Sequence, residues 1–267
     1  MNTYWSEERI RFQKDAAEVV GFYDVLATRI APQIAPHSLI CDAGCGLGYL
    51  SLALAKKCRE IVAVDRSDSA LSVLKKNLQQ KQIFNVIPQL GDICRLPIDR
   101  PYDVMIFCLF GNTLDTLKII KQQCRSHAIL IKKNWNRHRF ALDSANIYPT
   151  HFSRALEKLE QLGIHYSSAQ CQLEMGQPFR SMEDAARFFR LYQCGNRPKS
   201  LQRKEIEAKL LRTTSAAWPY FFPAPHSVGM IILHAADIPS LSVIDEYRKA
   251  TAKLEPLEST TAMQLHR

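Results

Sequence analysis

A glycine-rich turn between a short apolar run and an apolar helical pattern constrains this sequence most strongly. Residues 41–49 read CDAGCGLGY, with glycine at the alternate positions 44, 46 and 48. Glycine adopts backbone angles that other residues avoid and lets a ligand approach the main chain closely. The apolar positions 47, 50 and 54 have helical spacing, so the amide groups of a helix N-terminus would face whatever lies in the turn. We therefore expect a strand, a ligand-binding turn and a helix, in that order.

The residues around this turn indicate which ligand it holds. A β-branched run at 61–64 ends at Asp65, and an acid at that place can accept two hydrogen bonds from ribose hydroxyls. A dinucleotide-binding fingerprint would need a third glycine at position 49, where this chain has Tyr49. Asp42, just before the turn, does not belong to that fingerprint either. The pattern therefore disfavours NAD as the ligand.

Strand and helix patterns alternate along the chain. The expected strands lie at 38–41, 61–64, 86–87, 102–110, 128–131, 164–173 and 228–234. The main expected helices lie at 7–30, 113–124, 150–162 and 241–253, with two more between 181 and 213. Most of the strands are continuously apolar, which is typical of a parallel sheet covered by helices on both faces.

The pattern D-x-G-x-G-x-G at residues 42–48 resembles the first motif of class I S-adenosylmethionine-dependent methyltransferases. Asp65 at the end of the second strand, Gly91-Asp92 after the third and residues 102–106 as the fourth extend the resemblance over roughly residues 37–135. The resemblance implies a doubly wound α/β fold with a mostly parallel seven-stranded sheet, whose last strand is antiparallel. It also implies S-adenosylmethionine as the cofactor.

The same resemblance assigns the expected cofactor contacts. Asp42 would orient the methionine amino end, Asp65 would hold the ribose hydroxyls, and Asp92 would accept a hydrogen bond from the adenine amino group. The other expected cofactor-binding residues are Gly44, Cys45, Gly46, Gly48, Arg66, Ile93, Cys108 and Leu109.

Residues 178–226 are too long for a simple connection in such a fold, so we expect a helical and aromatic cap inserted before the last strand. The expected division is an N-terminal helical lid at 1–36, the cofactor-binding domain at 37–177, the cap at 178–226, the last strand and helix at 227–255, and a polar tail at 256–267.

The acceptor is less constrained than the cofactor. Residues 107–112 read FCLFGN, where enzymes that methylate exocyclic amines of bases carry an Asn/Asp-Pro-Pro-aromatic motif. The departure disfavours adenine and cytosine amino groups as acceptors. The expected pocket aromatics are Trp5, Trp135, Trp218 and Tyr220, with residues 218–226 expected to form an irregular loop because of their prolines.

No Ser-His-Asp order, metal-binding cluster or paired carboxylate stands out, so the catalytic residue stays unassigned and no metal is expected. The candidates for a general base are His138, His226 and Tyr4. The eight cysteines are scattered without zinc-site spacing, which favours reduced structural thiols.

The charge balance leaves two kinds of acceptor open. The 267-residue chain has a formal net charge of +9, and Lys and Arg gather at 118–139 and 187–204. No apolar run approaches the ~20 residues that cross a bilayer, so we expect a cytoplasmic protein without a membrane partner. The favoured function is methyl transfer to a small molecule, with an anionic metabolite as one option. The alternatives are an RNA (tRNA or rRNA) methyltransferase that uses the basic stretches, and a non-catalytic S-adenosylmethionine-binding protein.

Overall fold

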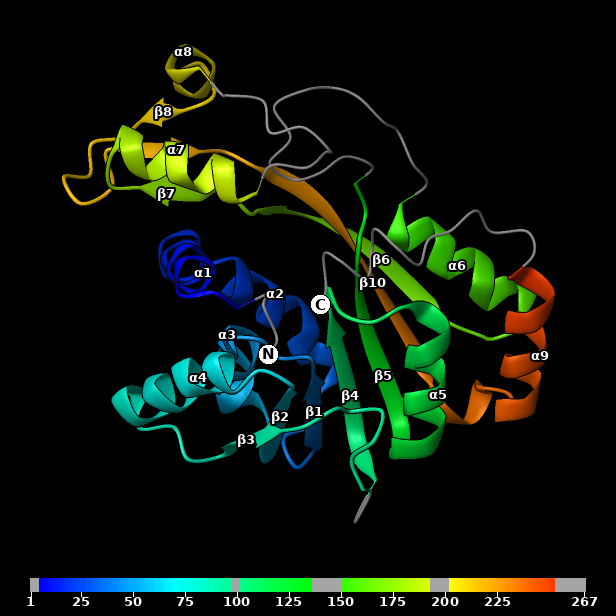
Figure 1. Cartoon of the computed structure of the whole chain (residues 1–267). Helices are drawn as coiled ribbons and strands as arrows, with labels where there is room; N and C mark the ends of the chain where they lie inside the picture. Colours follow the sequence, from blue (N-terminus) through cyan, green and yellow to red (C-terminus); the bar gives the residue numbers. More distant parts are fainter. Residues whose placement is uncertain (1–4, 98–100, 136–149, 193–201, 253–267) are drawn as a thin grey trace.

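The computed structural model describes residues 5–97, 101–135, 150–192 and 202–252, which form a seven-stranded sheet and a separate three-stranded sheet. Figure 1 shows the larger sheet in the lower part of the molecule and the smaller sheet, with α7 and α8, beyond one end of it. The strand β6(Ser167–Glu174) leads directly into the smaller sheet and the strand β10(Pro225–His234) returns from it.

The main sheet has the order β3-β2-β1-β4-β5-β10-β6. Its strands are β1(Leu39–Ala43), β2(Glu60–Asp65), β3(Val86–Leu90), β4(Tyr102–Cys108), β5(Cys124–Lys133), β6(Ser167–Glu174) and β10(Pro225–His234). Five strands from β3 to β5 pair in parallel, and β10 pairs antiparallel with both of its neighbours. The expected mostly parallel seven-stranded sheet with a reversed last strand is therefore confirmed.

Helices cover both faces of this sheet because its inner strands carry apolar side chains on both sides. All five residues of β1 are buried, with Ile40 facing one core and Leu39 and Cys41 facing the other. The first core includes α2(Phe22–Ile30), α3(Tyr49–Leu54) and α4(Asp68–Lys81). The second core includes α5(Thr113–Gln123), α6(His151–Gln161) and α9(Leu241–Thr251). Short 3-10 turns lie at η1(Ala31–Gln33), η2(Ala55–Lys57) and η3(Ala235–Asp237).

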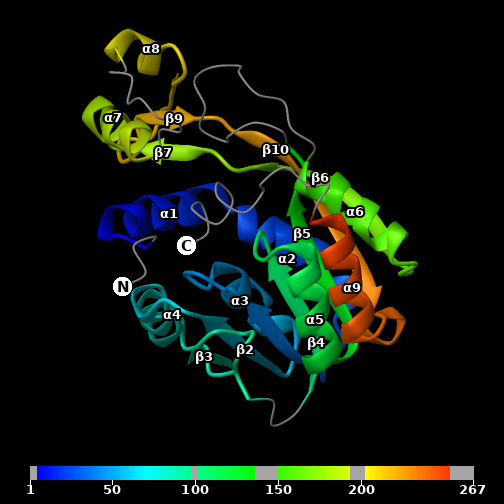
Figure 2. The same ribbon diagram turned by 45° about the vertical axis from the view of Figure 1, so that its right-hand side comes forward.

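Residues 177–224, which we call the inserted segment, build a third core with the first helix of the chain. The segment contains β7(Gln177–Phe179), α7(Met182–Leu191), α8(Arg203–Glu207), β8(Leu211–Arg212) and β9(Tyr220–Phe222). The fully buried ring of Phe12 in α1(Glu7–Val20) packs edge-on against Phe188, with ring centroids 5.0 Å apart, and against Phe179. Figures 1 and 2 show α1 beneath β7 and α7 in both views. The inserted segment thus shares its core with α1.

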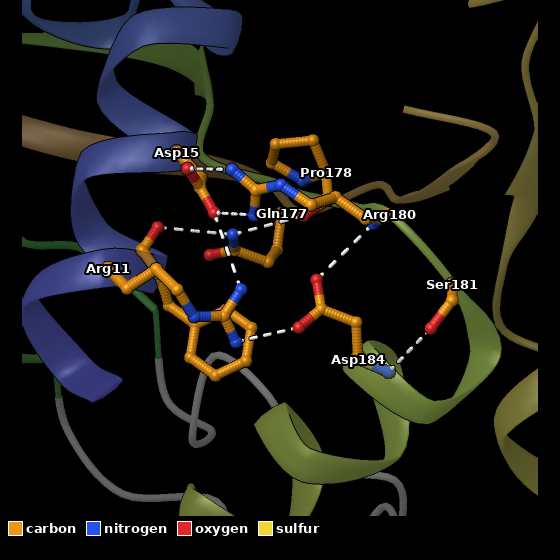
Figure 3. Close-up of polar contacts among 8 residues, drawn as sticks. Arg11, Asp15, Gln177, Pro178, Arg180, Ser181 and Asp184 are labelled. Atoms are coloured by element: carbon orange, nitrogen blue, oxygen red, sulfur yellow. Dashed lines mark hydrogen bonds and ion pairs between the residues drawn. The ribbon is translucent and has the colours of Figure 1, made fainter. Parts of the chain in front are cut away.

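An arginine–aspartate network, formed by Arg11, Asp15, Arg180 and Asp184, joins α1 to the inserted segment (Figure 3). The guanidinium of Arg180 binds both carboxylate oxygens of Asp15, with 2.8 Å between Nη2 and Oδ1. Arg11 donates to Asp184 at 2.6 Å. Both aspartates are buried; Asp15 is held by a bidentate arginine, and Asp184 accepts from Arg11 and from the backbone amide of Arg180. The network fixes α1 on the inserted segment.

Two expectations about local structure were wrong. The expected single helix at 7–30 is broken into α1 and α2 at Gly21, whose φ of 70° is left-handed and ends α1. The expected irregular loop at 218–226 contains strand β9, because Tyr220–Phe222 pairs with β7 and β8, and it also contains the first two residues of β10, which pair with β6. The division into domains, with its boundaries, stays a prediction, and the expected polar tail lies outside the described residues.

Candidate functional site

The glycine loop, residues 44–48, leaves β1 at the carboxyl end of the parallel strands. The amides of Gly44 and Cys45 donate to the carbonyl of Val64 in β2, at 2.8 and 3.0 Å. Gly44, Gly46 and Gly48 all have left-handed φ angles, of 71°, 55° and 74°. The loop conformation therefore requires glycine at these alternate positions.

Two aromatic rings lie so close to this loop that a side chain at Gly44 or Gly46 would clash with them. A Cβ added to Gly44 would lie 2.4 Å from the ring of Phe110, and one added to Gly46 would lie 2.9 Å from the ring of Trp5. Both distances are well inside van der Waals contact. Glycine at these two positions therefore lets the two rings lie directly against the main chain of the loop.

Asp65 ties the glycine loop to the next strand–helix turn. Its two carboxylate oxygens accept hydrogen bonds from the amides of Gly46 and Ser67, both at 2.9 Å. Its carbonyl accepts from the amide of Gly91, at 3.0 Å, so it also touches the end of β3. Asp65 ends β2, as the sequence predicts, and it stands where three strand ends meet.

Asp92 and Arg66 form the outer edge of the same region. Asp92 Oδ1 accepts from the amide of Cys94 at 3.1 Å, and Arg66 lies 3.7 Å from Oδ2. Ile93 is buried, and its carbonyl accepts from the side chain of Gln123 at 2.7 Å. The Asp92 carboxylate is about one-third exposed, so it faces the surface beside Asp65.

Asp42 is a buried acid at the base of the loop. Only 1% of its surface is exposed, and its Oδ2 accepts a hydrogen bond from the Ser51 hydroxyl at 2.6 Å. Burial raises the pKa of Asp42 to about 6, against the lowering effect of the Ser51 hydrogen bond. A carboxylate held in this way attracts a positively charged group strongly, because little water screens it.

The turn after β4 lies beside the glycine loop and is held by a buried lysine. Leu109 has a left-handed φ of 55°, and its amide donates to the carbonyl of Ile131 at 2.9 Å. Lys132 donates to the carbonyls of Gly111 at 2.8 Å and Phe110 at 3.4 Å. Burial, followed by the charge of Lys158, lowers the pKa of Lys132 to about 8. The lysine thus fixes a turn whose strained backbone needs support.

The thiol of Cys108 precedes this turn. Burial raises its pKa well above the ordinary value, so it stays a neutral thiol. The seven described cysteines, Cys41, Cys45, Cys58, Cys94, Cys108, Cys124 and Cys171, are all free. Within the described residues, no group of three His, Cys, Asp or Glu side chains could hold a metal ion.

A cavity opens beside the turn after β4, lined mainly by residues that the sequence analysis missed. Its lining residues on α1 are Gln13, Ala16, Ala17 and Val20. Phe22 and Tyr23 of α2, Leu109, and the pair Met175 and Gly176 just before the inserted segment complete it. Of the expected site residues, only Leu109 is among them. Alanine and valine on a helix carry no chemical signal, so the sequence alone could not single them out.

The expected pocket aromatics do not line this cavity. Trp5 lies over Gly46, and Trp135 stacks on His226 with ring centroids 4.6 Å apart. Trp218 packs under the guanidinium of Arg180, at 4.2 Å, and Tyr220 faces Arg212 at 5.4 Å. Two of the three candidates for a base, Tyr4 and His138, lie outside the described residues. The roles proposed for these side chains stay predictions.

Comparison with known proteins decides the family. A family model described as a methyltransferase domain matches residues 34–186, more than half of the chain. The chain belongs to the methyltransferase domain family. Its members of class I use S-adenosylmethionine as the methyl donor.

Several curated methyltransferases resemble the chain. The probable cobalt-precorrin-6B C(15)-methyltransferase (decarboxylating) of Methanothermobacter thermautotrophicus is 28% identical over 146 residues, covering 52% of this chain and 68% of that protein. The ubiquinone biosynthesis O-methyltransferase of Coxiella burnetii is 37% identical over 84 residues, which are 31% of this chain and 36% of that protein.

A further relative acts on RNA. The tRNA (guanine(37)-N(1))-methyltransferase Trm5b of Pyrococcus abyssi is 33% identical over 93 residues, which are 34% of this chain and 28% of that protein. The chain thus spans less than half the length of most of the curated relatives it matches. Among solved structures, the YcgJ protein of Bacillus subtilis has the same fold, with a TM-score of 0.51, 12% identity, and coverage of 80% of this chain and 97% of that one.

No helix among the described residues of this methyltransferase is both long and apolar enough to span a membrane.

Proposed function

We propose that this enzyme transfers a methyl group from S-adenosylmethionine to a small molecule held in the cavity beside the turn after β4. The observation that carries the proposal is the place of this cavity. This small, partly open cavity is bordered by α1, α2 and the two residues before the inserted segment, and it shares Leu109 with the turn that packs Phe110 against the glycine loop. Ligands of open α/β sheets bind at this carboxyl edge of the strands.

In this proposal the chain's own acids hold the donor. Asp42 binds the methionine amino group, Asp65 takes the ribose hydroxyls in exchange for its present hydrogen bonds, and Asp92 faces the adenine. The other expected contacts, Gly44, Cys45, Gly46, Gly48, Arg66, Ile93, Cys108 and Leu109, surround the same strand ends. When bound, S-adenosylmethionine supplies a methyl group on a positively charged sulfur, which leaves as a neutral thioether.

The protein's contribution to the reaction is mainly positioning. The cavity residues would hold the acceptor atom in line with the methyl group that S-adenosylmethionine would supply. Holding the acceptor in line, through walls such as Leu109 and Tyr23, supplies most of the rate enhancement that such a displacement needs. A general base is required only where the acceptor atom must lose a proton; His138, His226 and Tyr4 remain the candidates.

RNA is the alternative acceptor, favoured by the basic stretches 118–139 and 187–204 and by the tRNA-modifying relative. Several described basic residues in these stretches already have partners inside the molecule. Lys118 pairs with Asp245, and Arg125 with Asp103. Lys132 is buried. Because these side chains are paired or buried within the protein, fewer cations can bind RNA phosphates than the sequence suggests. A small molecule is therefore the preferred acceptor. The free thiols support the cytoplasm as the proposed location.

The proposed donor site is tested by Asp65→Ala, with the exposed Asp68→Ala as a matched control from the adjoining helix. We expect Asp65→Ala to weaken S-adenosylmethionine binding by about 1–3 kcal/mol, or roughly 5- to 150-fold, because hydrogen bonds to a charged group are lost. Asp68→Ala should bind as the wild type does. Isothermal titration calorimetry measures both, and equal affinities for the two variants would remove Asp65 from the site.

The acceptor class is tested with S-adenosylmethionine labelled in its methyl group. The enzyme is incubated with a small-molecule filtrate of cell extract and, separately, with total RNA. We expect label in the filtrate products and little in RNA. Label in RNA, together with RNA affinity that falls steeply as salt rises, would establish the alternative instead.

A further inference from the structure

We propose that the acceptor cavity takes a neutral, mostly apolar small molecule that carries a hydroxyl or a similar uncharged polar group. The inference rests on the proposed function and narrows it to a substrate class. None of the nine lining residues carries a formal charge, and six of them are Ala, Val, Phe, Leu or Met. An ionised ligand placed against these walls would lose part of its hydration without gaining a partner of opposite charge, which is unfavourable.

The polar part of the lining is a pair of neutral groups. Gln13 Nε2 donates to the Tyr23 hydroxyl at 3.0 Å, so the amide and the phenol lie side by side on one wall. The Gln13 amide oxygen accepts no hydrogen bond from the described residues. A ligand hydroxyl can donate to this oxygen, whereas a carboxylate or phosphate, which only accepts, would face it unfavourably.

The buried cation Lys132 points away from the cavity. Side chains alternate between the two faces of a strand, and Lys132 follows Ile131 in β5. Ile131 belongs to the core that includes Phe22 and Met175 of the cavity, so Lys132 lies on the opposite face and donates to the Phe110 and Gly111 carbonyls. Its charge therefore does not compensate an anionic ligand in the cavity.

The cavity wall on α1 is held in place from behind. Gln13, Ala17 and Val20 follow each other at intervals of one helical turn and face the cavity. The opposite face of α1 carries Asp15, whose carboxylate accepts hydrogen bonds from Arg180 in the arginine–aspartate network (Figure 3). A wall that is held from behind in this way is preorganised, and a preorganised apolar site selects by shape and by absence of charge.

Three small phenols test the charge preference directly. 4-Ethylphenol carries a neutral substituent, 4-hydroxybenzoate a negative one and 4-hydroxybenzylamine a positive one. Saturation-transfer NMR measures their dissociation constants with S-adenosylhomocysteine present and absent. We expect 4-ethylphenol to bind about tenfold more tightly than either charged probe, corresponding to about 1.4 kcal/mol. Binding of 4-hydroxybenzoate as tight as that of 4-ethylphenol, or no binding of 4-ethylphenol, would overturn the proposal.

The location is tested by Ala17→Phe, which fills the cavity, against Val19→Phe on the same helix. Val19 is 43% exposed and does not line the cavity. We expect Ala17→Phe to weaken 4-ethylphenol binding about tenfold or more, and Val19→Phe to leave it unchanged. Should circular dichroism show Ala17→Phe to be unfolded, Val20→Phe serves in its place. Binding that is insensitive to both cavity variants would overturn the assignment.

The outcome separates this inference from the proposed function. If 4-ethylphenol binds in an Ala17-dependent way while S-adenosylhomocysteine does not bind, the donor site is wrong and the cavity assignment stands. If S-adenosylhomocysteine binds and 4-ethylphenol does not, the donor site stands and the acceptor class is wrong.

Discussion

Replacing Asp42 by asparagine is expected to stabilise the folded protein at neutral pH. The carboxylate lies 1% exposed at the base of the glycine loop, and burial raises its pKa from 3.8 to about 6. At about 1.4 kcal/mol per pKa unit, keeping this group ionised in the fold costs about 3 kcal/mol above pH 6. Asparagine has the same shape, carries no charge, and can still accept the Ser51 hydrogen bond.

The direction of the pH dependence follows from the raised pKa. Between about pH 4 and pH 6 the folded state binds the Asp42 proton and the unfolded state has released it, so the free energy of unfolding falls as pH rises through this window. The cost is absent below about pH 4 and complete above about pH 6. Asp42→Asn removes this contribution, so its free energy of unfolding should fall less across the window than that of the wild type.

Urea unfolding at about pH 4.5 and about pH 7.5 measures the effect, with the exposed Asp68→Asn as the control. We expect Asp42→Asn to exceed the wild type by up to about 3 kcal/mol at the higher pH and by much less at the lower one. The same variant should bind S-adenosylmethionine more weakly. Equal stabilities of variant and wild type at pH 7.5, or parallel pH profiles, would refute the reasoning.

Two further predictions concern packing. Arg180→Met should lower the free energy of unfolding by about 2 kcal/mol, because it leaves the buried Asp15 with a poorer partner, whereas the exposed Arg212→Met should change it by less than about 0.5 kcal/mol. Equal losses in urea unfolding would contradict this. Gly229→Ala should cost about 2–3 kcal/mol, because a Cβ there would lie 2.0 Å from the Phe152 ring. Phe152→Leu in the same chain should recover part of that loss, and failure to do so would place the strain elsewhere.

The sequence predicted the main sheet well because its signals are local. Continuous apolar runs such as 61–64 and 128–131 became inner strands β2 and β5, and the glycine spacing at 44–48 reads directly as backbone conformation. Asp65 was found in the same way, because a strand followed by an acid is visible in one dimension. These features depend on neighbours in the chain.

The rest depends on contacts between distant segments. The strand β9 forms because Tyr220–Phe222 pairs with β7, about forty residues earlier in the chain. No local sequence pattern predicts that pairing. The pairing of Asp15 with Arg180 spans 165 positions, and each residue alone reads as an ordinary surface charge. The cavity was not predicted for the same reason. Ala17 lines it only because distant residues such as Leu109 and Met175 lie on its other sides.

The central claim, that this chain is an S-adenosylmethionine-dependent enzyme, is tested most directly by calorimetric titration of the wild-type protein. The titrants are S-adenosylmethionine, S-adenosylhomocysteine and NAD. The account predicts micromolar affinity, about −8 kcal/mol, for the two sulfur compounds and no binding of NAD. Absence of heat with both sulfur compounds, or binding of NAD in their place, would contradict it.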